Sequence, residues 1–123
     1  MDRFKFRAWD TKRNIMLHDV SVNNRMAVED GYQFYNQPTN GRLLVLMQCT
    51  GLKDRHGKLV FEGDVIQLGH YIFGLYSSRV DFIAGCFQQY PINQSGINSG
   101  ILNYVHHTCE IIGNIYENPE LIA

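Results

Sequence analysis

Two carboxylates lie two residues apart in the segment KLVFEGDVIQL at residues 58–68. Paired carboxylates can act as general acid and general base where their surroundings push their pKa values apart. Glu62 and Asp64 would share one face of a continuous strand, but glycine inside a strand typically marks a turn or a bulge, and Gly63 separates them. We therefore interpret the segment as a turn, in which Asp64 accepts backbone N–H bonds, Val65 is buried and Glu62 is exposed.

A second group with potential chemistry is HHTCE at residues 106–110. Histidine, cysteine and glutamate ligate zinc, and His107 and Cys109 would share a face of a strand. Further ligands would have to come from distant residues such as His56 or His70, and nothing in the spacing requires this. We interpret Cys109 as a small core residue, with the histidines at an edge or in the loop before it, and predict no metal and no cofactor.

Nucleophilic catalysis has no clear signature. Cys49, Cys86 and Cys109 each lie in apolar or aromatic runs, and buried structural cysteines are commoner than activated ones. The sequence has no GxSxG elbow, P-loop or GxGxxG. We predict no catalytic residues and a protein that is not an enzyme. The alternative is a hydrolase that uses Asp64 or the HHTCE groups.

Basic residues gather in two places. Arg3, Lys5 and Arg7 lie in the first strand, with Lys12 and Arg13 in the turn that follows. If that strand adjoins the turn KDRHGK at residues 53–58, a positive patch results that could hold single-stranded nucleic acid by charge and stacking. The opposing interpretation is a solvated strand face whose charges resist edge pairing. The candidate binding residues are Arg3, Lys5, Arg7, Trp9, Lys53, Arg55 and Lys58.

Composition limits the classes of function. The 123 residues suit one domain, and 45% apolar and 19% charged residues are typical of a globular protein. A net charge of -1 gives no overall field that attracts a polyanion. No run of apolar residues approaches a membrane span, the first residues do not resemble a secretion signal, and the odd number of cysteines indicates a reducing compartment. We predict a cytoplasmic protein that does not contact a membrane.

These groups must be positioned by short strands. RFKFRAW at residues 3–9 alternates, with Phe4, Phe6 and Ala8 on one face, and this period predicts a strand with one buried face. We expect a turn at Asp10 and Asn14, followed at residues 15–22 by the second strand of the same hairpin. A short strand and a loop are expected at residues 23–42, and a buried strand at residues 42–50.

The second half of the chain is also predicted to be β-rich. Strands are expected near 70–76, 79–84 and Phe87, then along 101–117 with a bend near Gly113. Asn118 is a candidate helix cap, with Pro119 opening a short helical turn. The residues expected to shape turns are Gly57, Gly63, Asp64, Gly113, Asn118 and Pro119.

Three stretches resemble the YopX family of bacteriophages and prophages of Gram-positive bacteria. They are FRAWD at residues 6–10, LMQCTGLKDRHGKLVFEGDVI at 46–66 and EIIGNIYENPELI at 110–122. The resemblance implies a small SH3-like barrel or roll, which agrees with an all-β chain with minor α content. We therefore predict one domain at residues 1–123, with a barrel core from about 44 to 117, an N-terminal hairpin at 3–22 and a short C-terminal helical turn.

The resemblance supplies no activity, because the family offers no catalytic or binding residues to carry over. We expect a phage or prophage accessory protein that acts as a protein-interaction module, with a protein partner or a second copy of itself. The C-terminal segment, with Tyr116 and Leu121, would dock on its own barrel or on that second copy. The first alternative is a nucleic-acid-binding barrel that uses the N-terminal basic strand.

Overall fold

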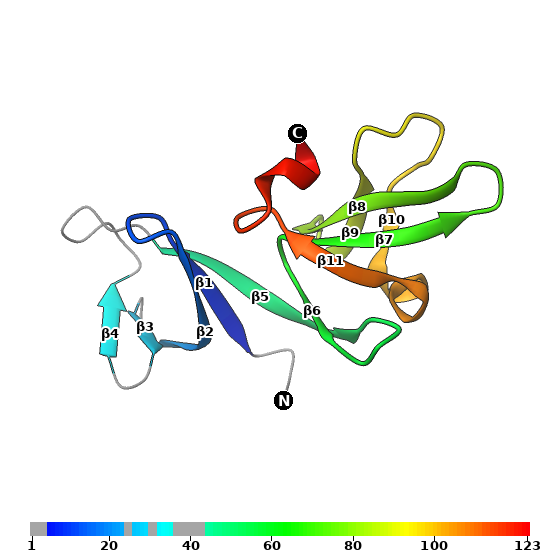
Figure 1. Ribbon diagram of the computed structural model, residues 1–123. Helices are drawn as coiled ribbons and strands as arrows, with labels where there is room; N and C mark the ends of the chain where they lie inside the picture. Colours follow the sequence, from blue (N-terminus) through cyan, green and yellow to red (C-terminus); the bar gives the residue numbers. More distant parts are fainter. Residues whose placement is uncertain (1–4, 24–25, 30–31, 36–43) are drawn as a thin grey trace.

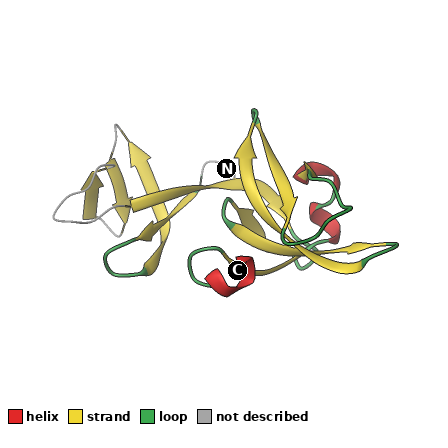
Figure 2. Cartoon of the chain, turned by 90° about the horizontal axis from the view of Figure 1, so that it is seen from above, coloured by secondary structure: helices red, strands yellow, loops and turns green. Residues whose placement is uncertain are grey.

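Antiparallel strands dominate the chain in the computed structural model, which describes residues 5–23, 26–29, 32–35 and 44–123. The strands are β1 (Phe6–Asp10), β2 (Ile15–Asn23), β3 (Met26–Glu29), β4 (Tyr32–Tyr35), β5 (Leu44–Lys53), β6 (Leu59–Phe61), β7 (Asp64–His70), β8 (Gly74–Ile83), β9 (Cys86–Pro91), β10 (Gly100–Ile101) and β11 (Glu110–Asn114). The 3-10 turns are η2 (Leu102–Tyr104), η3 (His106–Thr108) and η4 (Pro119–Ile122). Figure 2 shows these turns, in red, at the outside of the strands. The all-β prediction is confirmed, while the SH3-like barrel stays a prediction.

The strands form two sheets, and the long strand β5 runs from one half of the molecule to the other (Figure 1). One sheet has the order β4-β3-β2-β1-β5-β6 and the other β10-β9-β8-β7-β11. The first half of β5 pairs with β1 and the second half with β6, and the register shifts between Cys49 and Lys53. We call β1–β4 with the first half of β5 the N-terminal lobe, and the rest of the chain the C-terminal lobe.

The N-terminal hairpin is closed by its predicted turn residues. Asp10 Oδ1 accepts the backbone N–H groups of Lys12 and Arg13, at 3.0 and 3.1 Å. The carbonyl of Asp10 accepts the N–H of Asn14, which adopts a positive φ of 54°. Asparagine and aspartate tolerate this turn because their short side chains bond to nearby backbone. β1 and β2 pair antiparallel, as predicted for residues 3–22.

Strand β1 is covered on both faces, so the prediction of one buried face is wrong. Ala8 is fully buried in a cluster with Leu17, Val20 and Leu44. On the opposite face Arg7 is also buried, and Trp9 is half-buried and stacks on Tyr116 with ring centroids 5.8 Å apart. The alternating pattern identified the face toward the N-terminal lobe, but the other face is covered by residues more than 50 positions away.

The C-terminal lobe has its own core, formed by Val60, Ile66, Leu68, Val80, Leu102 and Cys109. Two predictions fail here. Residues 74–83 form one long strand, and the chain reverses at 71–73 instead of near residue 77. Residues 102–108 form 3-10 turns instead of strand, because burying Leu102 folds the backbone so that its carbonyl accepts the N–H of Val105.

Within the segment 23–42 the structure describes β3 and β4, which pair with each other. The prediction of a single strand there is therefore wrong. The turn signals Asp30-Gly31 and Pro38–Gly41 lie outside the described residues.

The close approach at Gly113 gives a testable prediction. A Cβ added there would lie 2.5 Å from Asn118 Oδ1 and 2.8 Å from Leu121 Cδ1. Gly113→Ala is therefore expected to lower the free energy of unfolding by about 1–3 kcal/mol, as overpacking typically does. Gly69→Ala is the matched control, because nothing lies within 4 Å of its Cβ position. Urea denaturation measures both variants, and equal stability of the two would contradict the prediction.

Candidate functional site

The carboxylates of Glu62 and Asp64 accept hydrogen bonds from different parts of the backbone. Gly63, with φ of 83°, turns the chain from β6 into β7, and Asp64 Oδ2 accepts the N–H of Phe61 at 2.8 Å. Val65 is fully buried, so the interpretation as a turn is confirmed for these residues. Glu62 departs from the prediction, because it is half-buried and its Oε1 accepts the N–H of Gln48 at 2.9 Å.

The sequence interpretation missed the partner of Asp64. Arg7 Nη2 lies 2.8 Å from Asp64 Oδ1 and also donates to the carbonyl of Glu62 at 3.1 Å. The guanidinium lies over the Phe61 ring, 4.9 Å from its centroid. The side chains of Arg7 and Asp64 are only 9% and 3% exposed, so this ion pair fastens β1 to β7 inside the molecule.

Burial sets the electrostatics of this pair. Desolvation raises the pKa of Asp64, while the adjacent Arg7 guanidinium and the N–H of Phe61 oppose that rise. Arg7 Nε is buried without a hydrogen-bond partner among the described residues. Both observations indicate that burying this ion pair carries a large desolvation cost.

A cavity of about 460 Å³ opens beside the ion pair, between the hairpin of β1 and β2 and the two edge strands β6 and β11. Its polar walls come from distant parts of the chain and include both cations and carboxylates. Its apolar walls belong mainly to β6 and β11. The lining residues are Arg7, His18, Lys58, Leu59, Phe61, Asp64, Ile111, Ile112, Gly113, Asn114, Glu117 and Asn118.

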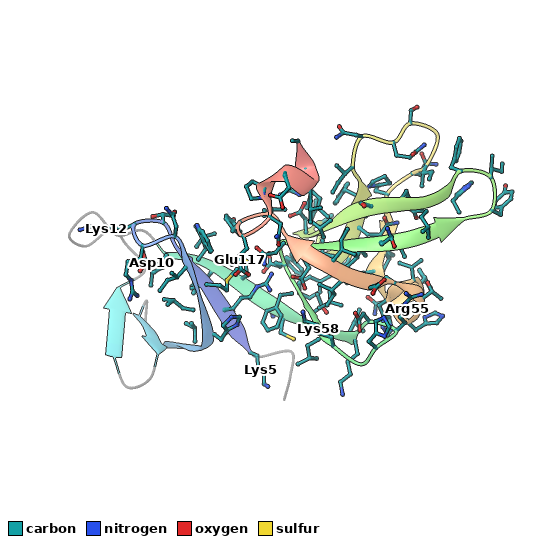
Figure 3. The ribbon with its side chains drawn as sticks, in the orientation of Figure 1. Lys5, Asp10, Lys12, Arg55, Lys58 and Glu117 are labelled. Carbon is teal, nitrogen blue, oxygen red and sulfur yellow. The ribbon has the colours of Figure 1, made fainter. Side chains whose placement is uncertain are left out.

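The proposed basic patch is only partly present. Lys5, Lys53, Arg55 and Lys58 are exposed, and Arg3 lies outside the described residues. Figure 3 shows Lys5, Lys58 and Arg55 spaced along the molecule instead of meeting at one point. Two members have other roles: Arg7 is buried against Asp64, and Trp9 stacks on Tyr116. Including Arg7 and Trp9 in a solvent-facing patch was wrong, because their strand face is covered by the C-terminal lobe.

Part of the charge of the neighbouring turn is paired with β11. Arg55 Nη2 lies 3.0 Å from Glu110 Oε2, and His56 Nε2 lies 3.3 Å from Glu110 Oε1. This pairing reduces the positive charge that residues 53–58 offer to a polyanion.

The HHTCE residues do not converge. Cys109 is fully buried in the core, where desolvation, with Asp54 nearby, raises the pKa of its thiol to about 11. His106 Nδ1 lies 2.7 Å from the carbonyl of Lys53, and Glu110 turns toward Arg55. In the described part of the chain no group of three or more histidine, cysteine, aspartate or glutamate residues could hold a metal. Asp64 lines the inter-sheet cavity, which neither the HHTCE residues nor Glu62 line.

The turn residues have structural roles. Gly57 has φ of 82°, and Gly113 leaves room for the tail, as shown above. Pro119 opens η4 as predicted, but Asn118 does not cap it with its side chain. Its Oδ1 instead accepts the N–H of Asn114 at 3.1 Å, because the tail folds back over the end of β11.

Asp54 joins the turn at residues 54–58 to β11 through three backbone N–H groups. Its Oδ1 accepts the N–H groups of His56 and Lys58, both at 2.9 Å, and its Oδ2 accepts that of Ile111 at 3.1 Å. The two bonds within the turn are typical of aspartate, whose short side chain bonds to backbone a few residues on. The bond to β11 joins residues 57 positions apart, and no local pattern indicates it.

Comparisons with known proteins agree with this architecture. The protein EF1440 from Enterococcus faecalis has a crystal structure that matches with a TM-score of 0.74 and 26% identity, over 97% of each chain. The crystal structure of protein yopX from Bacillus subtilis matches with a TM-score of 0.64 and 18% identity, over 98% of this chain and 99% of that one, and this similarity concerns the fold. A search among curated proteins gives no match.

No helix in the described residues is long and apolar enough to cross a membrane. The family model described as YopX protein matches residues 5–123, which is nearly the whole chain. The chain therefore belongs to the YopX family.

Proposed function

We propose that this protein is a phage- or prophage-encoded accessory protein that works in the host cytoplasm as a non-enzymatic protein-interaction module. The phage origin rests on the family resemblance. The interaction role rests on one observation, the exposed apolar tip of the β7–β8 hairpin at residues 71–75.

This hairpin tip presents large apolar side chains to solvent. Tyr71 is 92% exposed, Leu75 71% and Ile72 65%. Isolated exposed apolar residues are common on protein surfaces, but a contiguous group marks a site of interaction. Figure 1 shows the tip projecting from the C-terminal lobe, so its side chains are presented on a protrusion. A protrusion of this kind fits a pocket on a partner.

The hairpin tip is held in shape before any partner arrives. His70 Nδ1 accepts the N–H groups of Ile72 and Phe73, at 3.0 and 3.2 Å, and the His70 ring stacks on Tyr71 with centroids 4.7 Å apart. The Phe73 ring lies against Gly96 of the following loop, where an added Cβ would approach to 3.0 Å. A loop ordered in this way loses little entropy on binding, which favours affinity.

The charge of this region indicates the chemistry of the partner. Residues 65–78 contain no lysine, arginine, aspartate or glutamate. A tip without cations has no means of neutralising phosphates, which dominate the affinity for nucleic acid and for anionic membranes. We therefore assign it to an apolar pocket on another protein, where aromatic residues are frequent hot spots.

The test uses the Tyr71→Ser/Leu75→Ser double variant. Partners captured from host cells with the wild-type protein are purified and titrated by calorimetry. We expect the double variant to bind at least about 100-fold more weakly, as the loss of hot-spot residues implies. Tyr104→Ser is the matched control, because Tyr104 is 76% exposed on η2, outside the hairpin tip, and should leave the affinity unchanged.

Three outcomes would overturn the proposal. One is unchanged affinity of the double variant. Another is a strict absence of specific partners. The third is self-association in light scattering that the double variant abolishes, since the tip would then serve a second copy. Anisotropy titration with DNA and RNA at low salt tests the nucleic-acid alternative, which predicts binding that weakens steeply as salt rises.

A further inference from the structure

The cavity between the sheets offers a site that the proposed interaction role does not use. Its volume of about 460 Å³ lies in the range of small-molecule pockets, about 300–1,000 Å³. Its lining is divided about equally between polar and apolar surface, so it can contact both a charged group and an apolar body. The polar groups come from β1, β2, the turn before β6, the start of β7, and the end of β11 with the segment after it, so folding alone brings them together.

Two cationic or hydrogen-bonding groups at the cavity remain available. Lys58 and His18 are both exposed, and among the described residues neither side chain forms an ion pair or hydrogen bond. Arg7 and Asp64, deeper in the wall, are already paired with each other. The charge of Lys58 nevertheless reaches Asp64, where it opposes the rise of that carboxyl's pKa. Lys58 therefore stands close to the buried pair and retains its full capacity to bind an anion.

The remaining walls suit an apolar body. Leu59 and Phe61 line the cavity from β6, and Ile111 and Ile112 line it from β11. Ile112 is 36% exposed, because the register of β11 shifts between Ile111 and Gly113. A ligand that covers this apolar surface would gain binding free energy from its burial, in addition to that from any charge interaction.

One carboxylate at the cavity restricts the charge of the ligand. Glu117 is exposed, lines the cavity and accepts a hydrogen bond from Asn114 Nδ2 at 2.7 Å. Its negative charge repels a doubly charged anion more strongly than a singly charged one. A carboxylate carries one negative charge, whereas a phosphate monoester carries about 1.5 to 2 at neutral pH.

We propose that this cavity binds a small organic monocarboxylate. The carboxylate is held by Lys58 and His18, and the apolar body lies against Leu59 and Ile112. This site is separate from the hairpin tip, and neither assignment depends on the other.

Benzoate is the probe for the test, added to uniformly ¹⁵N-labelled full-length protein at constant ionic strength. We expect saturable shifts of the backbone amide signals of Lys58, Leu59 and Ile112. Benzamide, which has the same shape without the charge, should bind at least about tenfold more weakly, the factor that a charge-assisted hydrogen bond of about 1.4 kcal/mol provides. Phenyl phosphate should bind more weakly than benzoate because of Glu117.

Variants at exposed positions separate this site from general attraction. Lys58→Gln should weaken benzoate binding about tenfold, whereas Lys53→Gln, which removes an exposed lysine outside the cavity lining, should have no effect. Glu117→Gln should make benzoate bind more tightly. The proposal is overturned if benzoate gives no saturable shifts, if benzamide binds equally well, if phenyl phosphate binds more tightly, or if the two lysine variants weaken binding equally.

Discussion

Replacing Asp64 by alanine is expected to lower the free energy of unfolding by about 3–5 kcal/mol, because it leaves the Arg7 guanidinium buried without its counter-charge. The side chain of Arg7 is only 9% exposed, so most of it stays shielded from water when the carboxylate is removed. The N–H of Phe61 also loses its acceptor. Urea denaturation of the wild-type protein and the variant at neutral pH measures the loss.

The companion variant Arg7→Met tests the pair from its other side. It should cost a similar amount, because it leaves the Asp64 carboxylate buried without a cation. The double variant Arg7→Met/Asp64→Ala should cost no more than either single variant, since removing both charges removes the desolvation penalty as well. Additive losses would show that the two side chains stabilise the protein independently, and would contradict the coupling.

The direction of the Asp64 pKa reflects the desolvation cost of the pair. A carboxyl whose pKa rises on folding is easier to bury protonated than charged. The part of the stability that depends on its protonation is present below its unfolded pKa and is lost as the pH rises through the higher folded value. The ion pair is therefore a buried link between β1 and β7 that stabilises the protein only when both Arg7 and Asp64 are present. An Asp64→Ala variant that kept full stability but lost a binding or catalytic activity would restore the acid–base interpretation of the motif.

Much of the fold was predictable from local patterns. The turn at Asp10 and Asn14, the turn at Gly63, and the burial of Val65 follow from side-chain bonding, positive φ and strand alternation, all of which act within a few residues. The same patterns predicted the all-β class. They failed at residues 102–108, because β-branched and aromatic residues there favour strand in isolation, whereas burial of Leu102 favours compact turns.

The candidate sites were less predictable, because they depend on contacts between distant segments. Arg7 has the sequence surroundings of a solvent-exposed strand residue, and only its position opposite Asp64 makes it a buried partner. The cavity likewise combines His18, Lys58 and Glu117, which no spacing connects. The sequence shows that the hairpin tip is apolar, but it does not predict that these residues are exposed to solvent. The same residue types would also suit a buried core strand.

Asp54 gives the second large expected effect. Asp54→Ala should lower the free energy of unfolding by about 2–4 kcal/mol, because it removes three hydrogen bonds from backbone N–H groups to a charged acceptor. Asp54→Asn should cost less, about 1–2 kcal/mol, because one oxygen still accepts bonds within the turn while the bond from Ile111 is lost. Asp81, which pairs with Arg79 at the surface, is the matched control, and Asp81→Asn should change stability by less than about 1 kcal/mol.

The pH dependence of the Asp54 effect follows from its pKa. Burial tends to raise the pKa of Asp54, but the N–H groups of Lys58, Ile111 and His56 outweigh burial, so the pKa lies below the ordinary value of 3.8. A lowered folded pKa means that the stabilisation is fully present above about pH 3.8 and is lost as the pH falls through the folded value. The stability difference between wild type and Asp54→Asn should therefore shrink as the pH falls below 3.8. A difference that grows as the pH falls below 3.8 would show that the Asp54 carboxylate is not the group holding β11 to the turn.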